Sequence, residues 1–230
     1  MKLAVCGCSW SATSVLEEFK GTHFSEIVAD AMGAELYNFA VGGVSNFVIR
    51  LQIDEAIKIK PDLVIITPTY PDRIEIPTNS KIVKTEVSLY DVYNPHIHNN
   101  DLSTPIRTNT IPDLAEKNYH SIKEYMVYYY QPLAKLATDR WIIRDGLTQL
   151  KNSGIKFLVQ PQLLWSDQFI AYSFLNFIAT EKNIIPNDTC VFHNRVAPLA
   201  ARFDAGYHTT LETQQLFAKN LQTLIKEIII

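Results

Sequence analysis

Short apolar runs alternate with amphipathic stretches along most of the chain. Four runs have the length and composition of buried strands: Lys2–Cys6, Glu35–Ala40, Leu63–Thr67 and Ile155–Gln160. A shorter run, Thr189–His193, predicts a fifth strand. Continuous apolar strands of this kind are typical of parallel sheets that helices cover on both faces. The pattern therefore predicts a three-layer α/β/α sandwich with a central parallel sheet, of the flavodoxin-like strand order 2-1-3-4-5.

The stretches between these runs have helical spacing and recognisable ends. Glu17–Met32 is predicted to be mostly helical, with a break near Gly21 and a stop at Gly33. Ser45 has the character of a helix N-cap for Phe47–Ile59, and Pro61 ends that helix. Two further helices are predicted, at Leu114–Leu150 with an interruption at Pro132, and at Thr210–Ile228.

The alternation breaks between about residues 74 and 112. This interval carries Pro77, Pro95, Pro105 and Pro112 and is longer than ordinary connections. We therefore expect one domain over residues 1–230 with an inserted loop or helical region at about 74–112, placed over the strand ends as a lid. Tyr125 and Tyr128–Tyr130 come after it, and they are compatible with a cleft lining, with core packing or with a contact between two copies of the chain.

Composition narrows the function classes. The chain has 230 residues, 47% of them hydrophobic and 20% charged, which excludes global disorder. Its formal charge of −3 argues against a nucleic-acid partner, because dedicated nucleic-acid binders show a basic excess. No apolar run approaches the roughly 20 residues that a membrane helix needs, and the N-terminus lacks the features of a secretory signal. We expect a cytoplasmic or virion-associated protein with no membrane partner and three reduced cysteines.

Two segments at opposite ends of the chain carry candidate chemistry. Ser9 directly follows the first predicted strand, so it lies at the carboxyl edge of the sheet, where α/β proteins bind their ligands. His208 precedes the last predicted helix, and Asp204 lies four residues upstream. A serine, a histidine and a carboxylate can form a nucleophile, its base and an orienting group. Either segment alone is also explained by ordinary helix capping.

The chain resembles the SGNH (GDSL-type) hydrolases, a family of esterases, lipases and carbohydrate deacetylases. Gly7-Cys8-Ser9 is similar to the family's Gly-Asp-Ser, with cysteine in place of aspartate. The segment Asn38-Phe39-Ala40-Val41-Gly42-Gly43 is similar to its second block, Asn-x-Gly-x-x-Gly, with Ala40 at the first glycine. His208 matches the family's histidine before the last helix. The resemblance implies Ser9 as nucleophile, His208 as base, Asp204 as orienting acid and the Gly43 backbone N–H as an oxyanion donor.

The resemblance has two departures. After the third strand the family has Gly-x-Asn-Asp, and its asparagine completes the oxyanion hole; here Pro71 falls at that position and has no donor. We expect Asn46 to substitute, with Arg73 next in line or binding an anionic substrate. The second departure is that Asp204 and His208 are four residues apart, where the family has three.

The resemblance implies a metal-independent serine esterase or deacetylase that hydrolyses an acyl or acetyl ester, on a small molecule or a carbohydrate, without a cofactor. A degenerate binding or structural protein on the same fold, such as a virion component, is the alternative, and another α/β enzyme such as a small-molecule transferase is a third. Neither a dinucleotide fingerprint nor a Walker-type phosphate loop is present in the sequence.

Three other candidate sites have less support from the sequence. Cys6 and Cys8 with Cys190 and His193 have loose spacing for zinc, and the first and fifth strands are not neighbours in the predicted order. A second potential metal cluster is His96, His98 and Asp101, for which an exposed loop is the simpler explanation. The Cys8 thiol is an alternative nucleophile to Ser9, but its place at a strand end favours inward packing.

Overall fold

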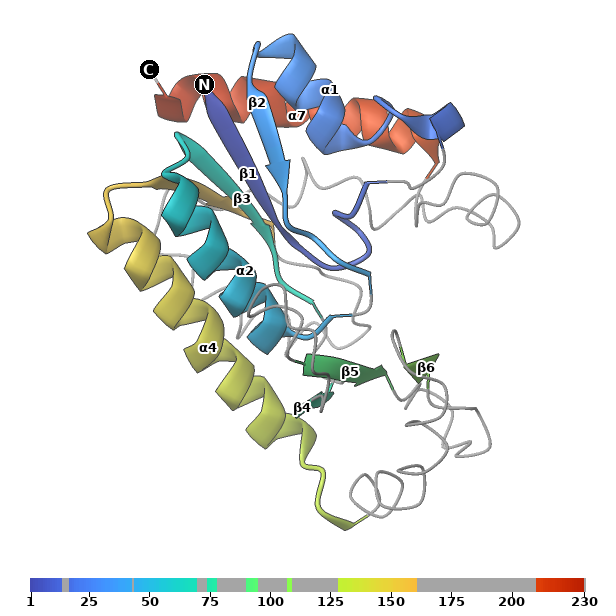
Figure 1. The fold of residues 1–230 in the computed structure, drawn as a ribbon, viewed down its shortest axis with the longest axis vertical. Coiled ribbons are helices and arrows are strands. Elements are labelled where there is room, and N and C mark those ends of the chain that lie inside the picture. The colour runs from blue at the N-terminus through green and yellow to red at the C-terminus, as the bar shows by residue number, and fades with distance from the viewer. Residues whose placement is uncertain are drawn as a thin grey trace.

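The computed structural model describes residues 1–13, 17–42, 44–69, 74–77, 90–94, 107–108, 128–160 and 210–229. At its centre is a parallel sheet in the order β2-β1-β3-β7 (Figure 1). The strands are β1 (Lys2–Gly7), β2 (Glu35–Asn38), β3 (Leu63–Thr67) and β7 (Lys156–Val159). The parallel sheet and the first four positions of the predicted strand order are thus confirmed. The fifth strand, expected at Thr189–His193, lies outside the described residues.

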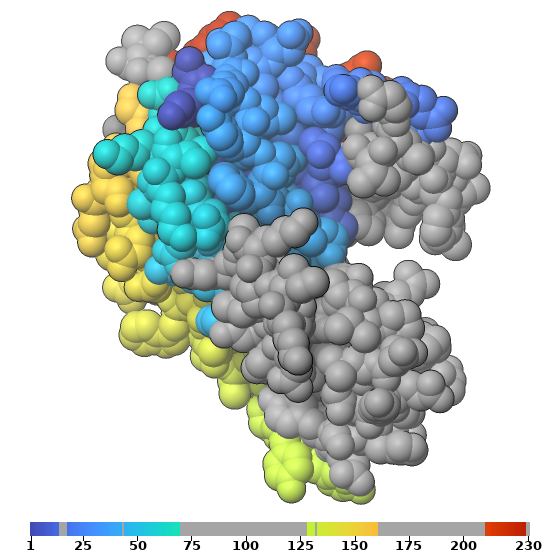
Figure 2. Space-filling view, viewed as in Figure 1, coloured from blue at the N-terminus to red at the C-terminus, as the bar shows by residue number. Residues whose placement is uncertain are grey.

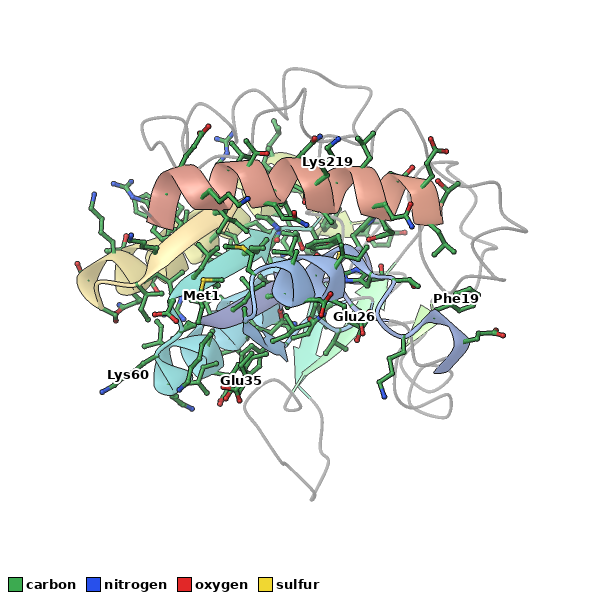
Figure 3. The ribbon with its side chains drawn as sticks, turned by 90° about the horizontal axis from the view of Figure 1, so that it is seen from above. Met1, Phe19, Glu26, Glu35, Lys60 and Lys219 are labelled. Carbon is green, nitrogen blue, oxygen red and sulfur yellow. The ribbon has the colours of Figure 1, made fainter. Side chains whose placement is uncertain are left out.

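Within the described residues, two pairs of helices cover the two faces of the sheet. α1 (Phe24–Ala31) packs with α7 (Leu211–Ile229) on one face, and α2 (Asn46–Ile59) packs with α4 (Pro132–Asn152) on the other. Figure 2 shows α2 and α4 lying against one another, and Figure 3 shows α7 spanning the sheet with Lys219 on its outer side. The α/β/α sandwich is therefore confirmed. Within the described ranges, no helix combines the length and the apolar character that a membrane span requires.

The core lies on both faces of β1 and β3. Every residue of β3 is buried, and Leu3 to Cys6 of β1 have no exposed surface. This explains their unbroken apolar sequences, since neither face of these strands meets water. On the α1–α7 side, the rings of Phe24 and Phe217 meet edge to face with their centroids 4.9 Å apart.

Local signals account for the ends of the first two helices. A 3-10 turn, η1 (Glu17–Phe19), precedes α1, and Gly21 and Gly33 on either side of α1 have positive φ angles of 79° and 58°. The Ser45 side chain accepts a hydrogen bond from Val48 N at 3.4 Å, as the predicted N-cap of α2 should. α2 ends at Ile59, and its C-cap Lys60 takes a left-handed conformation ahead of Pro61.

The interruption that the sequence predicted at Pro132 is confirmed, since helix α4 begins there. The periodicity predicted a helix from Leu114, interrupted at Pro132; the structure starts α4 with Pro132 in its first turn, where the missing N–H costs nothing. Residues 114–127 lie outside the described ranges. α4 packs tightly on α2 at Gly146, where a Cβ would lie 2.8 Å from Ile53 Cδ1. Glycine at this position therefore permits the close packing of the two helices.

The interval 74–112 contains a second, antiparallel sheet of three strands. These are β4 (Ile74–Pro77), β5 (Tyr90–Asn94) and β6 (Arg107–Thr108), in the order β4-β5-β6. We expected loop or helix here, but Ile74-Glu75-Ile76 and Asp91-Val92 alternate polar and apolar residues, which is the two-residue period of a strand. In Figure 1 this sheet lies on the side toward which the carboxyl ends of β1 and β3 point.

Candidate active site

Ser9 lies in a tight turn directly after β1. The Cys8 carbonyl accepts hydrogen bonds from Ser11 N at 2.9 Å and from Ala12 N at 3.1 Å, which closes the turn around Ser9. Ser9 is only partly buried, whereas Cys8 and Ser11 on either side are fully buried. The turn therefore presents Ser9 at the carboxyl edge of the parallel sheet, where the sequence predicted it.

The residue before this turn is held by a side chain of α2. Gly7 N donates to Gln52 Oε1 at 2.7 Å, and Gln52 Nε2 donates to Gly7 O at 3.2 Å. A Cβ at Gly7 would lie 1.9 Å from Thr67 Oγ1 and 3.0 Å from the Ser11 side chain. Only glycine fits between β3 and the returning turn, which gives the first residue of Gly7-Cys8-Ser9 a steric reason.

Hydrogen bonds also fix the residues that follow Ser9. The Ser11 and Thr67 hydroxyl groups are 2.6 Å apart in a buried hydrogen bond. Asn38, the last residue of β2, donates from Nδ2 to Ser11 O at 2.8 Å and accepts from Ala40 N at 2.9 Å. The Ser11 hydroxyl is thus committed to Thr67 and has no exposed surface, which leaves Ser9 as the serine of this turn that a substrate can reach.

The glycine-containing loop after β2 lies beside Ser9. Val41 N donates to Gly7 O at 3.2 Å, so this loop continues the pairing with β1. A Cβ at Gly42 would lie 3.7 Å from Ser9 Cβ, which is ordinary van der Waals contact. The second block of the sequence motif is therefore adjacent to the candidate nucleophile. Gly43, whose N–H we expect to serve the oxyanion, lies outside the described residues.

The Asn46 amide has a different set of partners from the one we expected. Its Nδ2 donates to Thr69 O at 2.8 Å and to Asp139 Oδ2 at 3.0 Å, and its Oδ1 accepts from Thr69 N at 2.7 Å. Both N–H protons are therefore used, and Asn46 is 1% exposed. The oxyanion role does not fit this geometry, because no proton of the amide remains to donate. Asn46, the first residue of α2, instead links the chain after β3 to Asp139 in the interior of α4.

Asp139 is the charged member of this buried cluster. Its carboxylate is paired with Lys135 one turn earlier in α4, and the Lys135 ammonium group is 2.5 Å from Oδ1. The pairing and the Asn46 bond satisfy both carboxylate oxygens, which a buried charge requires. Sequence reasoning missed Asp139, since a separation of 93 positions along the chain hides its contact with Asn46.

A second buried polar group adjoins the Ser9 turn from the other face of the sheet. His23 is the N-cap of α1, has no exposed surface, and lies with Nε2 3.3 Å from Trp10 O and Nδ1 2.7 Å from Ser25 Oγ. Burial lowers the pKa of His23 to about 4, although its hydrogen bond to the Trp10 carbonyl acts in the opposite direction. The sequence signal for this cap was Glu26, three residues after His23, in the spacing of a capping box.

The two cysteines near the site are buried in the core. Cys8 has no exposed surface and belongs to the apolar cluster beneath the sheet edge, which agrees with the inward packing that we expected. Burial raises the pKa of the Cys6 thiol far above its usual range. A buried neutral thiol such as that of Cys6 is a poor nucleophile.

Several predicted site residues lie outside the described ranges: Asp204, His208, Gly43, Arg73 and, at the third block, Pro71. The same holds for Cys190 and His193 and for His96, His98 and Asp101, so the two metal sites stay predictions. Among the described residues, no three His, Cys, Asp or Glu side chains gather in a way that could hold a metal ion.

Comparison with known proteins defines the fold. No family model and no curated protein sequence matches the chain. Among solved structures, TesA is similar over 99% of both chains, with a TM-score of 0.57 and 14% identity. The psychrotrophic esterase EstA from Pseudoalteromonas covers 98% of this chain and 97% of its own, with a TM-score of 0.55 and 9% identity. The similarity to the acetyl xylan esterase AlAXEase covers 98% of this chain and 100% of the esterase chain, with a TM-score of 0.53 and 11% identity.

At these identities the similarity concerns the fold. The chain shares the α/β/α fold of these esterases, which is the fold that its sequence resemblance implied. In this fold the described site consists of the Ser9 turn, the adjacent Gly42 loop and the clamped end of β3.

Proposed function

We propose that the chain is a metal-independent serine hydrolase that cleaves an ester, with Ser9 as its nucleophile. The observation that carries the proposal is the placement of Ser9. It is the partly exposed serine of a turn fixed on both sides, at the carboxyl edge of a parallel sheet, in van der Waals reach of the Gly42 loop. A nucleophile held in a single geometry by its neighbours saves the entropy of finding that geometry during the reaction.

The proposed reaction is acyl transfer in two steps. His208, oriented by Asp204, removes the proton from Ser9 Oγ while the oxygen attacks the ester carbonyl carbon. The carbonyl oxygen becomes an oxyanion held by the N–H groups of Ser9 and Gly43. The C–O bond to the alcohol then breaks, and the alcohol leaves with the proton from His208. Water, deprotonated by His208, attacks the acyl group in turn and restores Ser9. Arg73 is assigned to an anionic part of the substrate.

The hydrogen bonds of Asn46 to Thr69 and Asp139 lower the rate of ester hydrolysis that we expect. With both of its N–H protons committed and Pro71 at the family position, neither asparagine donor is available to the proposed oxyanion hole, which relies on two backbone N–H groups. Loss of one such donor costs on the order of 100- to 1000-fold in rate. Slow turnover, fastest on activated esters, is therefore the expected behaviour. The same observation supports the second candidate, a degenerate binding or structural protein on this fold.

The choice of substrates to test rests on the fold and on the surface. One structurally similar protein is an acetyl xylan esterase, and Tyr128, Tyr129 and Trp141 are largely exposed, as aromatic side chains that stack on sugar rings must be. We therefore propose an acetylated carbohydrate as the natural substrate class. Acetylated xylan and p-nitrophenyl acetate together separate carbohydrate specificity from general esterase activity.

The deciding experiment labels the nucleophile. The wild-type protein is incubated with a fluorophosphonate probe, digested and mapped by mass spectrometry, and hydrolysis of p-nitrophenyl acetate and butyrate is measured in parallel. We expect the adduct on Ser9 and none on Ser11. Ser9→Ala and His208→Ala should abolish both labelling and turnover, whereas Ser153→Ala, an exposed serine after α4, should change neither. Turnover that survives Ser9→Ala would refute the proposal, and absence of both labelling and turnover would favour the binding protein.

A further inference from the structure

His23 makes more contacts than a helix cap requires. Its Nδ1 atom accepts a hydrogen bond from Ser25 N at 3.3 Å, and the Glu26 carboxylate accepts one from His23 N at 3.2 Å. These two hydrogen bonds belong to the capping box of α1. The opposite nitrogen, Nε2, is 3.3 Å from Trp10 O. One ring therefore joins the start of α1 to the residue directly after Ser9.

The contacts define a single tautomer of this ring. Nδ1 accepts from a backbone N–H, so it carries no proton, and the Ser25 hydroxyl 2.7 Å away donates to it as well. The proton of the neutral imidazole then lies on Nε2, which donates it to the Trp10 carbonyl. Burial favours this neutral form, and the ring of Phe24 packs against the imidazole at 4.4 Å between centroids.

The same chain of hydrogen bonds continues to the next peptide of the turn. Asn38 Nδ2 is 3.5 Å from Ser25 Oγ and donates to Ser11 O at 2.8 Å. The Trp10 carbonyl is thus held by His23 and the Ser11 carbonyl by Asn38. These are the carbonyl groups of the two residues that come after Ser9 in the turn, and the side chains that hold them also contact one another through Ser25.

Histidine is an unusual choice for a cap whose only task is to start a helix. Asn, Asp, Ser and Thr supply the required acceptor with a shorter side chain and are the preferred N-caps. A buried imidazole also loses its hydration. What histidine adds is a second nitrogen on the far side of the ring, and that nitrogen is the one that reaches Trp10.

We propose that His23 is a positioning residue, whose buried ring fixes the Trp10 carbonyl and thereby the turn that presents Ser9. As a role in catalysis this rests on the proposed function of Ser9; as a constraint on the turn it can be measured without any activity.

The first test uses the unmodified protein. A long-range ¹H–¹⁵N spectrum distinguishes the two neutral tautomers of each histidine, and His23 is assigned as the signal absent from His23→Asn. We expect the Nε2–H pattern for His23 at neutral pH. A proton on Nδ1, or a rapidly exchanging mixture of the two tautomers, would overturn the proposal, since neither can donate steadily to Trp10.

The second test separates the cap from the tie to Trp10. His23→Asn retains an acceptor for the helix start but removes the donor that reaches Trp10. Its matched control is Glu26→Ala, which removes the other half of the capping box and leaves the ring in place. Amide hydrogen exchange at Ser11 and Ala12 reports opening of the turn, because both amides donate to Cys8 O.

We expect His23→Asn to accelerate exchange at Ser11 and Ala12 by about three- to tenfold, the effect of one hydrogen bond on local opening. Labelling of Ser9 by the fluorophosphonate should slow by a similar factor. Glu26→Ala should accelerate exchange in the first turn of α1 and leave Ser11 and Ala12 within about twofold of the wild type. Asn38→Asp, which keeps the acceptor for Ala40 N but loses both donors, should repeat the effect at Ser11 if His23→Asn does not fold.

The outcomes distinguish the two hypotheses. Unchanged exchange at Ser11 and Ala12 in His23→Asn overturns the positioning role, whatever the activity of the wild type. Faster exchange with unchanged Ser9 labelling overturns the catalytic part of that role. A wild-type protein that neither labels nor hydrolyses esters refutes the proposed function alone, since the tautomer and exchange measurements still decide whether His23 fixes the turn.

Discussion

The buried His23 ring makes the stability of the protein depend on pH. The pKa of histidine is 6.5 in the unfolded chain, and burial lowers it to about 4 in the folded protein. Above pH 6.5 the ring is neutral in both states and costs nothing. As pH falls below 6.5, His23 becomes protonated in the unfolded chain but stays neutral in the folded protein. The free energy of unfolding therefore decreases between pH 6.5 and about 4.

The size of this loss is set by the shift in pKa. Each pKa unit corresponds to about 1.36 kcal/mol, so the whole window is worth about 3 kcal/mol, and about 2 kcal/mol of it is lost between roughly pH 8 and pH 5. The ring has no exposed surface, so solvent screening does not reduce the figure. For a domain of ordinary stability, about 2 kcal/mol is a large fraction of the free energy of unfolding.

The assay is urea unfolding monitored by tryptophan fluorescence at a series of pH values, for the wild type and His23→Asn. Other groups titrate in the same range, and comparison of the two proteins removes their contribution. The variant should be less stable than the wild type at neutral pH. The difference in their free energies of unfolding should decrease by about 2 kcal/mol toward pH 5, because asparagine does not titrate. Parallel curves for the two proteins would show that His23 titrates near its ordinary pKa and is therefore not held in a buried, neutral state.

Three further predictions concern packing around the site, and each is measured by urea unfolding. Gly7→Ala should destabilise the protein by at least about 3 kcal/mol, because the new Cβ would lie 1.9 Å from Thr67 Oγ1; a change below about 1 kcal/mol would contradict the tight approach of the turn. Asn46→Ala should cost about 3 kcal/mol, because it leaves the buried N–H and C=O of Thr69 without partners; lost turnover at unchanged stability would instead restore Asn46 as an oxyanion donor. Phe217→Ala should cost about 3 to 5 kcal/mol and leave the pH dependence unchanged.

Much of the fold could be predicted because its signals are local. The bounds of β3 were predicted to the residue, and Gly33 and Ser45 act as the helix end and helix start that their residue types indicate. Each depends on neighbours within a few positions. The apolar runs also sufficed for the parallel sheet, since a strand buried on both faces has no polar side to obscure its pattern.

The polar contacts of the site could not be predicted in the same way. Asn46 comes after a strand end in the sequence, as an oxyanion donor should, but its partners Thr69 and Asp139 come from two other elements of the fold. The link from His23 to Trp10 likewise depends on how α1 packs beside the turn. Residue type and position suggested the location of the candidate site. Which donor binds which acceptor depends on tertiary contacts. The roles of His208, Asp204, Gly43 and Arg73 stay predictions.

The two hydrogen bonds between the Asn46 amide and the Thr69 backbone affect which segments of this fold can be replaced. Both backbone polar groups of Thr69 are bound by one amide, so α2 fixes the position and direction in which the chain leaves the sheet, independently of the residues after Thr69. The segment beyond that point can then vary in length and sequence without shifting β3 or the neighbouring Ser9 turn. Thr69 is therefore a natural junction for exchanging the inserted segment between proteins of this fold, and a library of grafted segments could alter specificity on an unchanged scaffold.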